Sequence, residues 1–548
     1  MRGDVVSAWA AACVGLLAAA TAPPVRAQEP ALDAGLYRLY QSTAELGRET
    51  FRRTATAFES TMELPVLSAR LTYHTEFDAA GHVARFELRA FNLATDSLTV
   101  DYTVVASRDS LHFTQTRPGA SPSERQWAKP GVVDAISAPQ SVAGLVALAD
   151  RAHRRDTTFR AWGVGEDSVI TFTVRFAADT ARVVSGPFEV RALLGPDGRG
   201  QSAEIPLQRV RIERWAGGGG DSPPPLPGLH RPPADYGAPA GADYTAEEVR
   251  VPVQPARGDT FSLAGTLTVP KSGRAPYPAA VMITGSGLED RDENLWPLVR
   301  GYRPFRQIAE RLAAAGVAVL RVDDRSFGGS TGDAREATTE DFAGDVAAEV
   351  AWLRARPGID GRRIALIGHS EGGVIAPLVA ARDPRIAAIV MMAGTAKPGV
   401  QVLLDQSLGP IERVQGLAPG RRAELMAAAR QAVAADTASS RWMRWFRSYD
   451  PLPTARRVRQ PVLILQGAVD RQVSAGQADT LAAAMRTAGN RDVTERVFPH
   501  LNHLFLVSPT DGSPSEYPAL TNTSIGGDVL DTLAEWLAGR LAARGGGR

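Results

Sequence analysis

Ser370 stands in a context that is typical of a catalytic nucleophile. It lies in Gly368-His-Ser-Glu-Gly372, a segment of the form G-x-S-x-G. The apolar residues Ile364–Ile367 before it predict a short buried strand, whereas the spacing of apolar residues after Glu371 predicts a helix. A serine on such a sharp strand-to-helix turn has a strained backbone, and glycines at 368 and 372 avoid the clashes that side chains would make there. The motif and its surroundings therefore predict Ser370 as a nucleophile.

Two groups downstream of Ser370 could form a proton-transfer triad with it. A serine needs a base to take its proton and an acid to orient that base. After a turn of this kind the acid and the histidine follow in the chain, each on a loop after a strand. Only His500 and His503 follow Ser370, and both come after the last expected strand. His503 is preferred because a loop of several residues must bring the ring back over the sheet edge, and His500 is the alternative. Asp470, directly after the preceding strand, is the predicted acid, and a helix cap is its alternative role.

The sequence also offers two backbone N–H groups for the negative charge that develops on a carbonyl oxygen during attack. The N–H of Glu371 follows the nucleophile and opens a helix, where the helix dipole favours negative charge. The second donor is expected in the loop Gly285-Ser286-Gly287, because small residues let the backbone approach a substrate. Ser286 is the preferred donor and Gly287 the next. An ordinary glycine-rich turn is the alternative for this loop.

From about Thr245 onward, apolar strands alternate with amphipathic helices. Val249–Val253 and Phe261–Val269 are expected to pair as antiparallel edge strands, and a helix is expected at Pro304–Ala315. Near-continuous apolar strands between amphipathic helices indicate a mostly parallel sheet with helices on both faces. The number of such strands predicts an eight-stranded sheet.

The segment between the sixth and seventh strands, about 395–460, is longer than a simple crossover. Its residues 421–435 have a helical pattern, and its end carries the aromatic residues Trp442, Trp445 and Phe446. An insertion at this position commonly covers the serine as a lid, and these aromatic side chains could line a substrate pocket. They could equally attach the lid to the core.

Taken together, the motifs resemble those of the α/β-hydrolase superfamily. They are Gly368–Gly372, the loop 284–292, the segment 323–330 (DDRSFGGS) and the segment 501–505 (LNHLF). More narrowly, they resemble bacterial exported serine hydrolases of the dienelactone-hydrolase and prolyl-oligopeptidase-like branch, from about residue 245 to the C-terminus. The resemblance implies an α/β-hydrolase fold with a helical lid. It also implies acyl transfer to water, most often as a carboxylesterase acting on a small-molecule acyl substrate. The charged residues 323–325 are interpreted as ion pairs below the site.

Other functions are compatible with the same residues. An exopeptidase or amidase could use the triad, with the N-terminal part as a size filter, and so could a thioesterase. Residues 32–216 show no four-stranded blade repeat and are too few for a full propeller. The non-enzyme alternative is an envelope binding or assembly protein, against which the intact triad argues. We expect no metal or other cofactor, because the His500/His503 spacing is not that of a helical zinc pair and no third ligand is apparent.

The N-terminal half has a different pattern. Residues 28–216 alternate with period two, as in Val83–Phe91, and Ser141–Arg154 predicts a short helix. We therefore expect a mainly antiparallel β domain that packs, dimerises or shapes a substrate site. Residues 217–244 are rich in glycine and proline and predict a linker before the hydrolase domain at 245–548.

The first residues predict export. The apolar run Val5–Thr21 follows Arg2 and precedes Val25-Arg-Ala27, which resembles a signal peptide cleaved after residue 27. Cys13, the only cysteine, lies in this run, so a protein cut there has no disulfide. The net charge of +1 gives no reason to expect nucleic acid or an anionic membrane as a partner. We expect a periplasmic or secreted protein without membrane insertion after cleavage, and the sequence leaves a homo-oligomer open.

Overall fold

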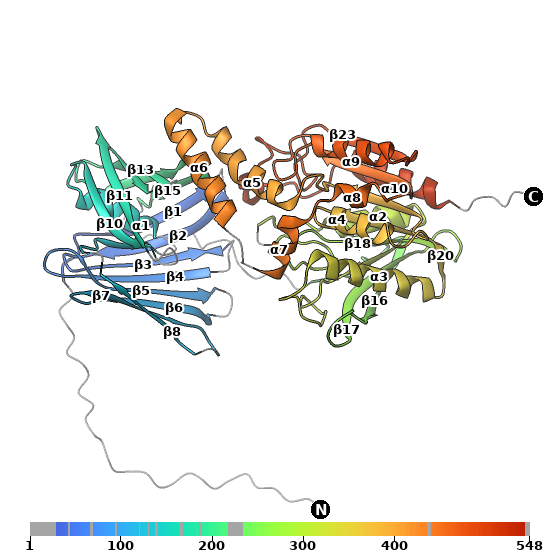
Figure 1. Cartoon of the computed structure of the whole chain (residues 1–548), viewed down its shortest axis with the longest axis horizontal. Helices are drawn as coiled ribbons and strands as arrows, with labels where there is room; N and C mark the ends of the chain where they lie inside the picture. The colour runs from blue at the N-terminus through green and yellow to red at the C-terminus, as the bar shows by residue number, and fades with distance from the viewer. Residues whose placement is uncertain are drawn as a thin grey trace, which may run out of the picture.

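The computed structural model describes residues 29–542 except for 42–43, 66–68, 94–95, 120, 130, 138–140, 164–167, 186–187, 217–233, 297, 418 and 436–439. The predicted signal peptide and most of the predicted linker lie outside the described residues. Figure 1 shows an N-terminal body of strands beside a C-terminal body of strands and helices. Within the described ranges, no helix has both the length and the apolar character that a membrane crossing would need.

The N-terminal body is built on one sheet of fifteen strands. The strand order is β8-β7-β6-β5-β4-β3-β2-β1-β15-β14-β13-β12-β11-β10-β9, so almost every strand pairs with a neighbour in sequence. Pairing is antiparallel except between β9 and β10. The strands are β1 (Asp33–Gln41), β2 (Ala44–Arg53), β3 (Ala57–Leu64), β4 (Ala69–Phe77), β5 (Val83–Asn92), β6 (Leu98–Ala106), β7 (Ser110–Thr116), β8 (Ser123–Ala128), β9 (Ala135–Ser137), β10 (Thr157–Gly163), β11 (Ser168–Ala177), β12 (Thr180–Ser185), β13 (Phe188–Leu194), β14 (Gly200–Ile205) and β15 (Val210–Arg214).

Helix α1 (Val142–Arg151) lies in the concave face of this curved sheet (Figure 1). It contacts β12 to β14 on one side and β2 and β3 on the other. Ser141 caps the helix by accepting a hydrogen bond from the N–H of Gly144 at 2.8 Å. The carboxyl group of Glu49 is fully buried beside this end, where it accepts from the N–H of Ala143 at 2.9 Å, and burial raises its pKa. The helix expected at 141–154 is therefore present and ends a few residues earlier.

The C-terminal body is built on a sheet with the order β16-β17-β19-β18-β20-β21-β22-β23. β16 and β17 are antiparallel, as the sequence predicts, and β17 is also antiparallel to β19, whereas the other neighbouring strands pair in parallel. The strands are β16 (Tyr244–Val253), β17 (Phe261–Pro270), β18 (Tyr277–Ile283), β19 (Ala318–Val322), β20 (Ile359–His369), β21 (Ala388–Met392), β22 (Val462–Gly467) and β23 (Val493–Phe498).

Helices cover both faces of this sheet, because its central strands are apolar on both sides. In β20, Ile364 and Leu366 belong to the core under α3, α4 and α9, whereas Ala365 and Ile367 belong to the core under α2 and α10. The helices are α2 (Pro304–Ala314), α3 (Thr339–Ala355), α4 (Gly372–Ala380), α9 (Gly476–Thr487) and α10 (Gly527–Leu541). This two-sided burial is the usual arrangement of a parallel sheet.

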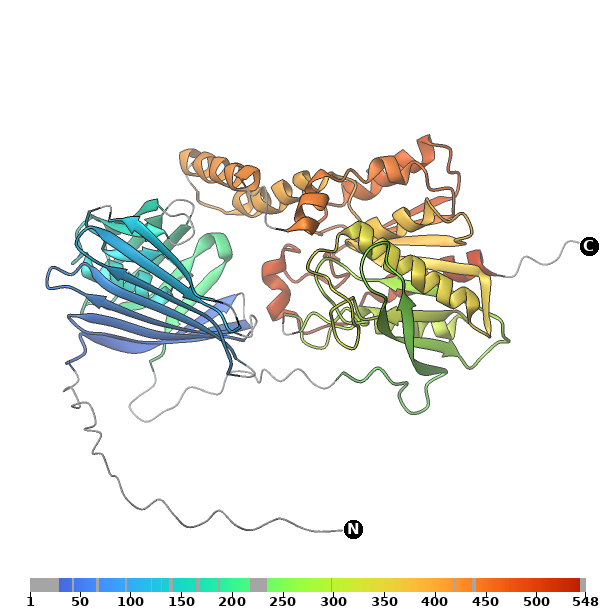
Figure 2. The same ribbon diagram turned by 60° about the horizontal axis from the view of Figure 1, so that its bottom comes forward.

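The long insertion between β21 and β22 is helical. It contains α5 (Gly399–Arg413), α6 (Pro419–Ala435), α7 (Arg441–Ser448) and α8 (Leu452–Ala455). Figures 1 and 2 show α6 reaching out from the C-terminal body on the side of the N-terminal body, whereas α7 stays against the C-terminal body.

An arginine–aspartate pair links the two bodies. Arg209, between β14 and β15, donates from Nη1 to Oδ1 of Asp511 at 2.9 Å and from Nη2 to Oδ2 at 2.7 Å. The same Nη1 donates to the hydroxyl of Ser513 at 3.1 Å. These hydrogen bonds from Arg209 hold the pKa of Asp511 well below its ordinary value. A two-pronged pair of this kind fixes orientation as well as distance.

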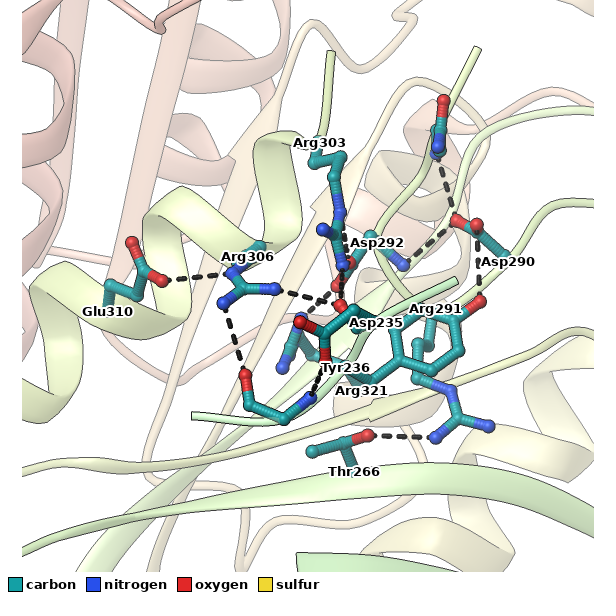
Figure 3. Close-up of polar contacts among 12 residues, drawn as sticks. Asp235, Tyr236, Thr266, Asp290, Arg291, Asp292, Arg303, Arg306, Glu310 and Arg321 are labelled. Atoms are coloured by element: carbon teal, nitrogen blue, oxygen red, sulfur yellow. Dashed lines mark hydrogen bonds and ion pairs between the residues drawn. The ribbon is translucent and has the colours of Figure 1, made fainter. Parts of the chain in front are cut away.

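The end of the predicted linker packs on the C-terminal body (Figure 3). The ring of Tyr236 lies 4.1 Å from the guanidinium carbon of Arg291, and its hydroxyl donates to Asp290 at 3.3 Å. The carbonyl oxygen of Asp235 accepts a hydrogen bond from Arg306 at 2.8 Å. Composition marks this stretch as a linker, but its aromatic ring and backbone carbonyls supply contacts that composition does not reveal. The C-terminal body therefore includes residues before the predicted boundary at 245.

The ion pairs expected for residues 323–325 are found for two of the three. Arg291 donates from Nε and Nη2 to the two carboxylate oxygens of Asp323, each at 3.0 Å. Arg325 donates from Nε to Asp345 at 2.7 Å. Asp324 instead accepts hydrogen bonds from the loop after β18.

Candidate active site

Ser370 sits on a strained turn between β20 and α4. Its φ of 53° is in the left-handed region, which a residue with a side chain rarely adopts. The turn is possible because its glycines lack side chains. A Cβ on Gly368 would lie 2.0 Å from the carbonyl oxygen of Gly372, and a Cβ on Gly372 would lie 2.2 Å from that of Ile283. Gly368 and Gly372, which we call the elbow glycines, are therefore required because the backbone approaches them so closely.

The structure brings Asp470 and His503 together. Oδ2 of Asp470 accepts a hydrogen bond from Nδ1 of His503 at 2.8 Å, and both side chains are buried. The other oxygen of Asp470 accepts the N–H groups of Gln472 and Val473 at 2.8 and 2.9 Å, so the aspartate also fixes its own loop. With its proton on Nδ1, the imidazole presents Nε2 as a base. His500, the alternative base, is exposed and makes no such contact with Asp470.

The base lies beside the nucleophile turn. The ring of His503 is 4.9 Å from the ring of His369, the residue before Ser370. Among the described residues, the Ser370 hydroxyl and His503 Nε2 form no hydrogen bond. Such catalytic contacts commonly tighten only when substrate binds. The arrangement can perform proton transfer at a serine.

The loop that is predicted to supply one oxyanion donor lies beside the nucleophile. A Cβ on Gly285 would lie 3.5 Å from the Cβ of Ser370, so the loop after β18 adjoins the nucleophile. The N–H of Gly285 is already used, since it donates to Glu289 and Glu293 at 3.1 Å each. In the described part of the chain, the N–H groups of Ser286 and Glu371 donate to no protein acceptor. They remain available for a developing oxyanion.

A second carboxylate–histidine pair, which the sequence analysis missed, lies under the site. Oε1 of Glu293 is 2.6 Å from Nδ1 of His369, and Nε2 of His369 donates to the carbonyl oxygen of His503 at 2.9 Å. Burial lowers the pKa of His369, but the charge and hydrogen bond of Glu293 outweigh it and leave the pKa raised. Glu293 also holds Gly285. One buried pair therefore links the nucleophile turn, the base loop and the oxyanion loop.

Burial raises the pKa of three other acidic groups around the site. Burial and the neighbouring charges of Glu293 and Asp324 raise the pKa of Glu289 well above its ordinary value. Burial raises the pKa of Asp324 to about 7, although it accepts from Thr284 at 2.7 Å and from the N–H of Glu289 at 2.8 Å. Burial also raises the pKa of Glu371. Within the described ranges, no group of three or more His, Cys, Asp or Glu residues is placed to hold a metal ion.

One of the three aromatic residues that are predicted to lie in a lid contacts the nucleophile turn. Nε1 of Trp442 in α7 donates to Oε1 of Glu371 at 2.8 Å, and its ring stacks on Phe446 at 5.1 Å. Trp445 stacks on Tyr449 at 4.4 Å and packs against the domain core. The structure therefore places Trp442 beside the nucleophile turn, with Phe446 stacked on it, and gives Trp445 an attaching role.

The C-terminal half of the chain is similar to known proteins. Residues 300–510 match the family model described as serine aminopeptidase, S33. The esterase EstD of Thermotoga maritima is 28% identical over 284 residues, which cover 50% of this chain and 65% of that protein. The dipeptidyl aminopeptidase BIII of Pseudoxanthomonas mexicana is 26% identical over 266 residues, covering 46% of this chain and 35% of that protein. A solved structure of Est1E from Butyrivibrio proteoclasticus with ferulic acid has 18% identity and a TM-score of 0.35, and the match covers 53% of this chain and all of that one.

This chain thus spans less than two thirds of the length of either curated relative. The family match and the esterase relative support the α/β-hydrolase superfamily for the C-terminal body. A large antiparallel β domain precedes it.

Proposed function

We propose that the protein is a serine hydrolase that cleaves carboxylic esters through an acyl-enzyme intermediate. The observation that carries the proposal is the buried Asp470–His503 pair beside a serine at φ 53°. The unengaged N–H groups of Glu371 and Ser286 support it further. The similarity to a protein named as an esterase favours an ester over an amide.

The residues account for both halves of the reaction. The hydroxyl oxygen of Ser370 attacks the ester carbonyl carbon while Nε2 of His503 takes its proton, and Asp470 stabilises the resulting imidazolium. The N–H groups of Glu371 and Ser286 stabilise the oxyanion. The alcohol leaves with the proton from His503. Water then attacks the acyl-enzyme with His503 again as base, which releases the acid and restores Ser370.

A fluorophosphonate probe followed by peptide mass spectrometry tests this mechanism directly. We expect one label, on Ser370, together with turnover of a short p-nitrophenyl ester series that falls as the acyl chain lengthens. Ser370→Ala should abolish both. Ser286→Ala is the matched control, because it removes a hydroxyl from the same site but keeps the backbone N–H, and its turnover should stay within a few-fold. Full ester turnover by Ser370→Ala would refute the mechanism.

An aminopeptidase is the second candidate, because the matching family model is described as a serine aminopeptidase and one relative is named as a dipeptidyl aminopeptidase. The same triad would serve an amide. An aminoacyl p-nitroanilide in the assay distinguishes the two, since faster turnover of the anilide than of the esters would establish the peptidase.

The proposal includes export to the periplasm or the medium, which residues 1–27 support by their resemblance to a signal peptide. N-terminal sequencing of the protein recovered from fractionated cells should find a mature chain that begins at Gln28. A chain that keeps Met1 and stays with the cytoplasm would contradict it.

A further inference from the structure

The N-terminal body contains a cavity between the concave face of its sheet and helix α1. Its empty volume is about 700 Å³, part of which is open to solvent. The lining is mainly apolar and includes Phe58, Phe77, Phe86, Leu148 and Phe172. It belongs to a different body from Ser370, so the triad makes no use of it.

The cavity is elongated along β4 and α1. Tyr73, Thr75 and Phe77 all line it, and because alternate residues of a strand share a face, it extends over about 13 Å from the first to the last. Ser60 is the register partner of Tyr73, and its hydroxyl hydrogen-bonds that of Ser141 at 3.2 Å. The N-terminal end of α1 therefore lies at the Tyr73 end of the cavity.

A cation, Arg151, occupies the other end. Arg151, in the last turn of α1, lines the cavity with its guanidinium 4.9 Å from the ring of Phe77. It donates to the carbonyl oxygens of Gly81 at 2.8 Å and Asp134 at 3.1 Å, and forms no ion pair with a carboxylate among the described residues. Burial lowers the pKa of Arg151, and the charge of Asp134 opposes that shift.

Asp134 and Arg53 are the charged neighbours of Arg151 that line this end, and the charge of Asp134 attracts Arg151 without an ion pair among the described residues. The carboxylate of Asp134 lines the cavity and accepts the backbone N–H of Arg160 at 2.8 Å. Arg53, which also lines the cavity, is paired with Asp150. The charged side chains that line this end are therefore two cations, Arg53 and Arg151, and one anion, Asp134, and of the cations only Arg53 has an ion-pair partner among the described residues.

The Tyr73 end has an unused hydrogen-bonding group. Tyr73 is only 5% exposed, and its hydroxyl has no hydrogen-bond partner among the described residues. Burial raises its pKa, so the group remains a neutral hydroxyl. A buried polar group without a partner is costly, and a ligand oxygen would relieve that cost.

We propose that this cavity binds an elongated carboxylic acid with an apolar middle and a second oxygen at its far end. The carboxylate pairs with Arg151, the chain packs among the phenylalanine rings, and the far hydroxyl or carbonyl hydrogen-bonds Tyr73. An extended ω-hydroxy acid of about ten carbons matches the length of the cavity. This binding site is independent of the triad and of the reaction proposed for it.

Titration calorimetry of the full-length protein with three probes of equal length tests the proposal. The probes are 10-hydroxydecanoate, decanoate and 1,10-decanediol. We expect 10-hydroxydecanoate to bind most tightly. Decanoate, which cannot reach Tyr73 with an oxygen, should bind about fivefold more weakly. The diol, which lacks the charge, should bind about 10- to 100-fold more weakly.

Matched variants test which side chain recognises each end of the probe. Tyr73→Phe should abolish the preference for 10-hydroxydecanoate over decanoate. Arg151→Gln should abolish the preference for 10-hydroxydecanoate over 1,10-decanediol. The controls are Tyr102→Phe and Arg155→Gln, whose side chains do not line the cavity and should leave all three affinities unchanged. Ala147→Phe, on the lining face of α1, should block every probe.

The outcomes are decisive in each arm. Equal affinity for the three probes, or no saturable binding of 10-hydroxydecanoate, would overturn the proposal. So would preferences that survive Tyr73→Phe and Arg151→Gln. Because no probe is an ester, the result does not depend on whether Ser370 is a nucleophile.

Discussion

Replacement of Glu293 by Gln would remove one negative charge from beneath the site without touching a substrate. Oε1 of Glu293 accepts from the N–H of Gly285 and contacts Nδ1 of His369, which holds the carbonyl oxygen of His503. If the Gln oxygen takes the place of Oε1, its NH₂ group occupies the position of Oε2, which has no partner among the described residues. If the amide is reversed, its N–H faces the N–H of Gly285. Neither orientation reproduces the native contacts.

The expected cost follows from these contacts. A hydrogen bond to a charged group contributes about 1.5–3 kcal/mol, and a buried donor left without an acceptor costs a similar amount. We therefore expect Glu293→Gln to lower the free energy of unfolding by about 2 kcal/mol at pH 6. Loss of positioning of the base and oxyanion loops should lower kcat about tenfold, which corresponds to about 1.4 kcal/mol of barrier.

The pH dependence separates this charge effect from a simple packing defect. Because Glu293 leaves the pKa of His369 raised in the folded protein, the pair stabilises the fold fully below the pKa of an unfolded histidine, about 6.5. That stabilisation is lost as the pH rises through the folded pKa. The difference in unfolding free energy between wild type and Glu293→Gln should be greatest near pH 6 and shrink towards pH 9.

Urea unfolding at pH 6, 7.5 and 9 measures that difference, with ester turnover recorded in parallel. Glu340→Gln is the control, because Glu340 pairs with Arg382 at the surface, where both side chains are nearly half exposed. It should change the unfolding free energy by less than about 1 kcal/mol at every pH. A Glu293→Gln effect that stays constant from pH 6 to pH 9 would refute the role of the buried charge.

Three further substitutions test other parts of the site. Asp470→Asn should fold normally but lower kcat about 10³- to 10⁴-fold, because the amide cannot hold the imidazole tautomer; circular dichroism and ester kinetics check this. Gly372→Ala should lower the melting temperature measured by calorimetry, since overpacking against the carbonyl oxygen of Ile283 costs about 1–3 kcal/mol; an unchanged melting temperature would contradict the tight elbow. Trp442→Phe removes the indole N–H bond to Glu371, so KM across the ester series should change several-fold while thermal stability stays nearly constant.

Helices and strands could be predicted from the sequence where a single periodicity of apolar residues dominates. The helix expected at Pro304–Ala315 spans Pro304–Ala314 in the structure, and the strand expected at Phe261–Val269 runs one residue further to Pro270. The strand expected at Ile364–Ile367 runs from Ile359 to His369, because Ile359, Gly368 and His369 also pair with neighbouring strands. Apolar patterning therefore finds the buried centre of an element better than its ends.

The N-terminal half shows the limit of patterning. Period-two alternation correctly indicates an antiparallel β domain. It shows which residues of a strand share a face, but it does not show which strands pair. Which strands become neighbours depends on turns and cross-strand packing, so a single fifteen-stranded sheet with β1 beside β15 was not predictable. The cavity around α1 depends on how that sheet curves, and no local signal in the sequence describes it.

In the candidate site, too, some residues could be identified from local sequence and others only from the folded chain. Ser370 could be named from a local motif, whereas the choice between His500 and His503 needed the path of a loop in space. Glu293 and His369 are 76 residues apart and share no periodic pattern. Only their meeting in the folded chain identifies them as a pair. A glutamate in an acidic loop and a histidine inside the elbow motif were the available signals, and neither indicates the other.

The loop of the oxyanion hole shows how such pairs determine function. Between β18 and α2 the backbone has no long regular element, so its N–H groups need other acceptors. Carboxylates supply them: Glu289 and Glu293 accept from Gly285, Asp324 accepts from Glu289, and Asp323 accepts from Arg291 at 2.9 Å. Each acceptor is itself held by burial, by an arginine or by His369. The sheet thus brings the loop to the nucleophile, but the buried acids determine which N–H groups are left to face a substrate.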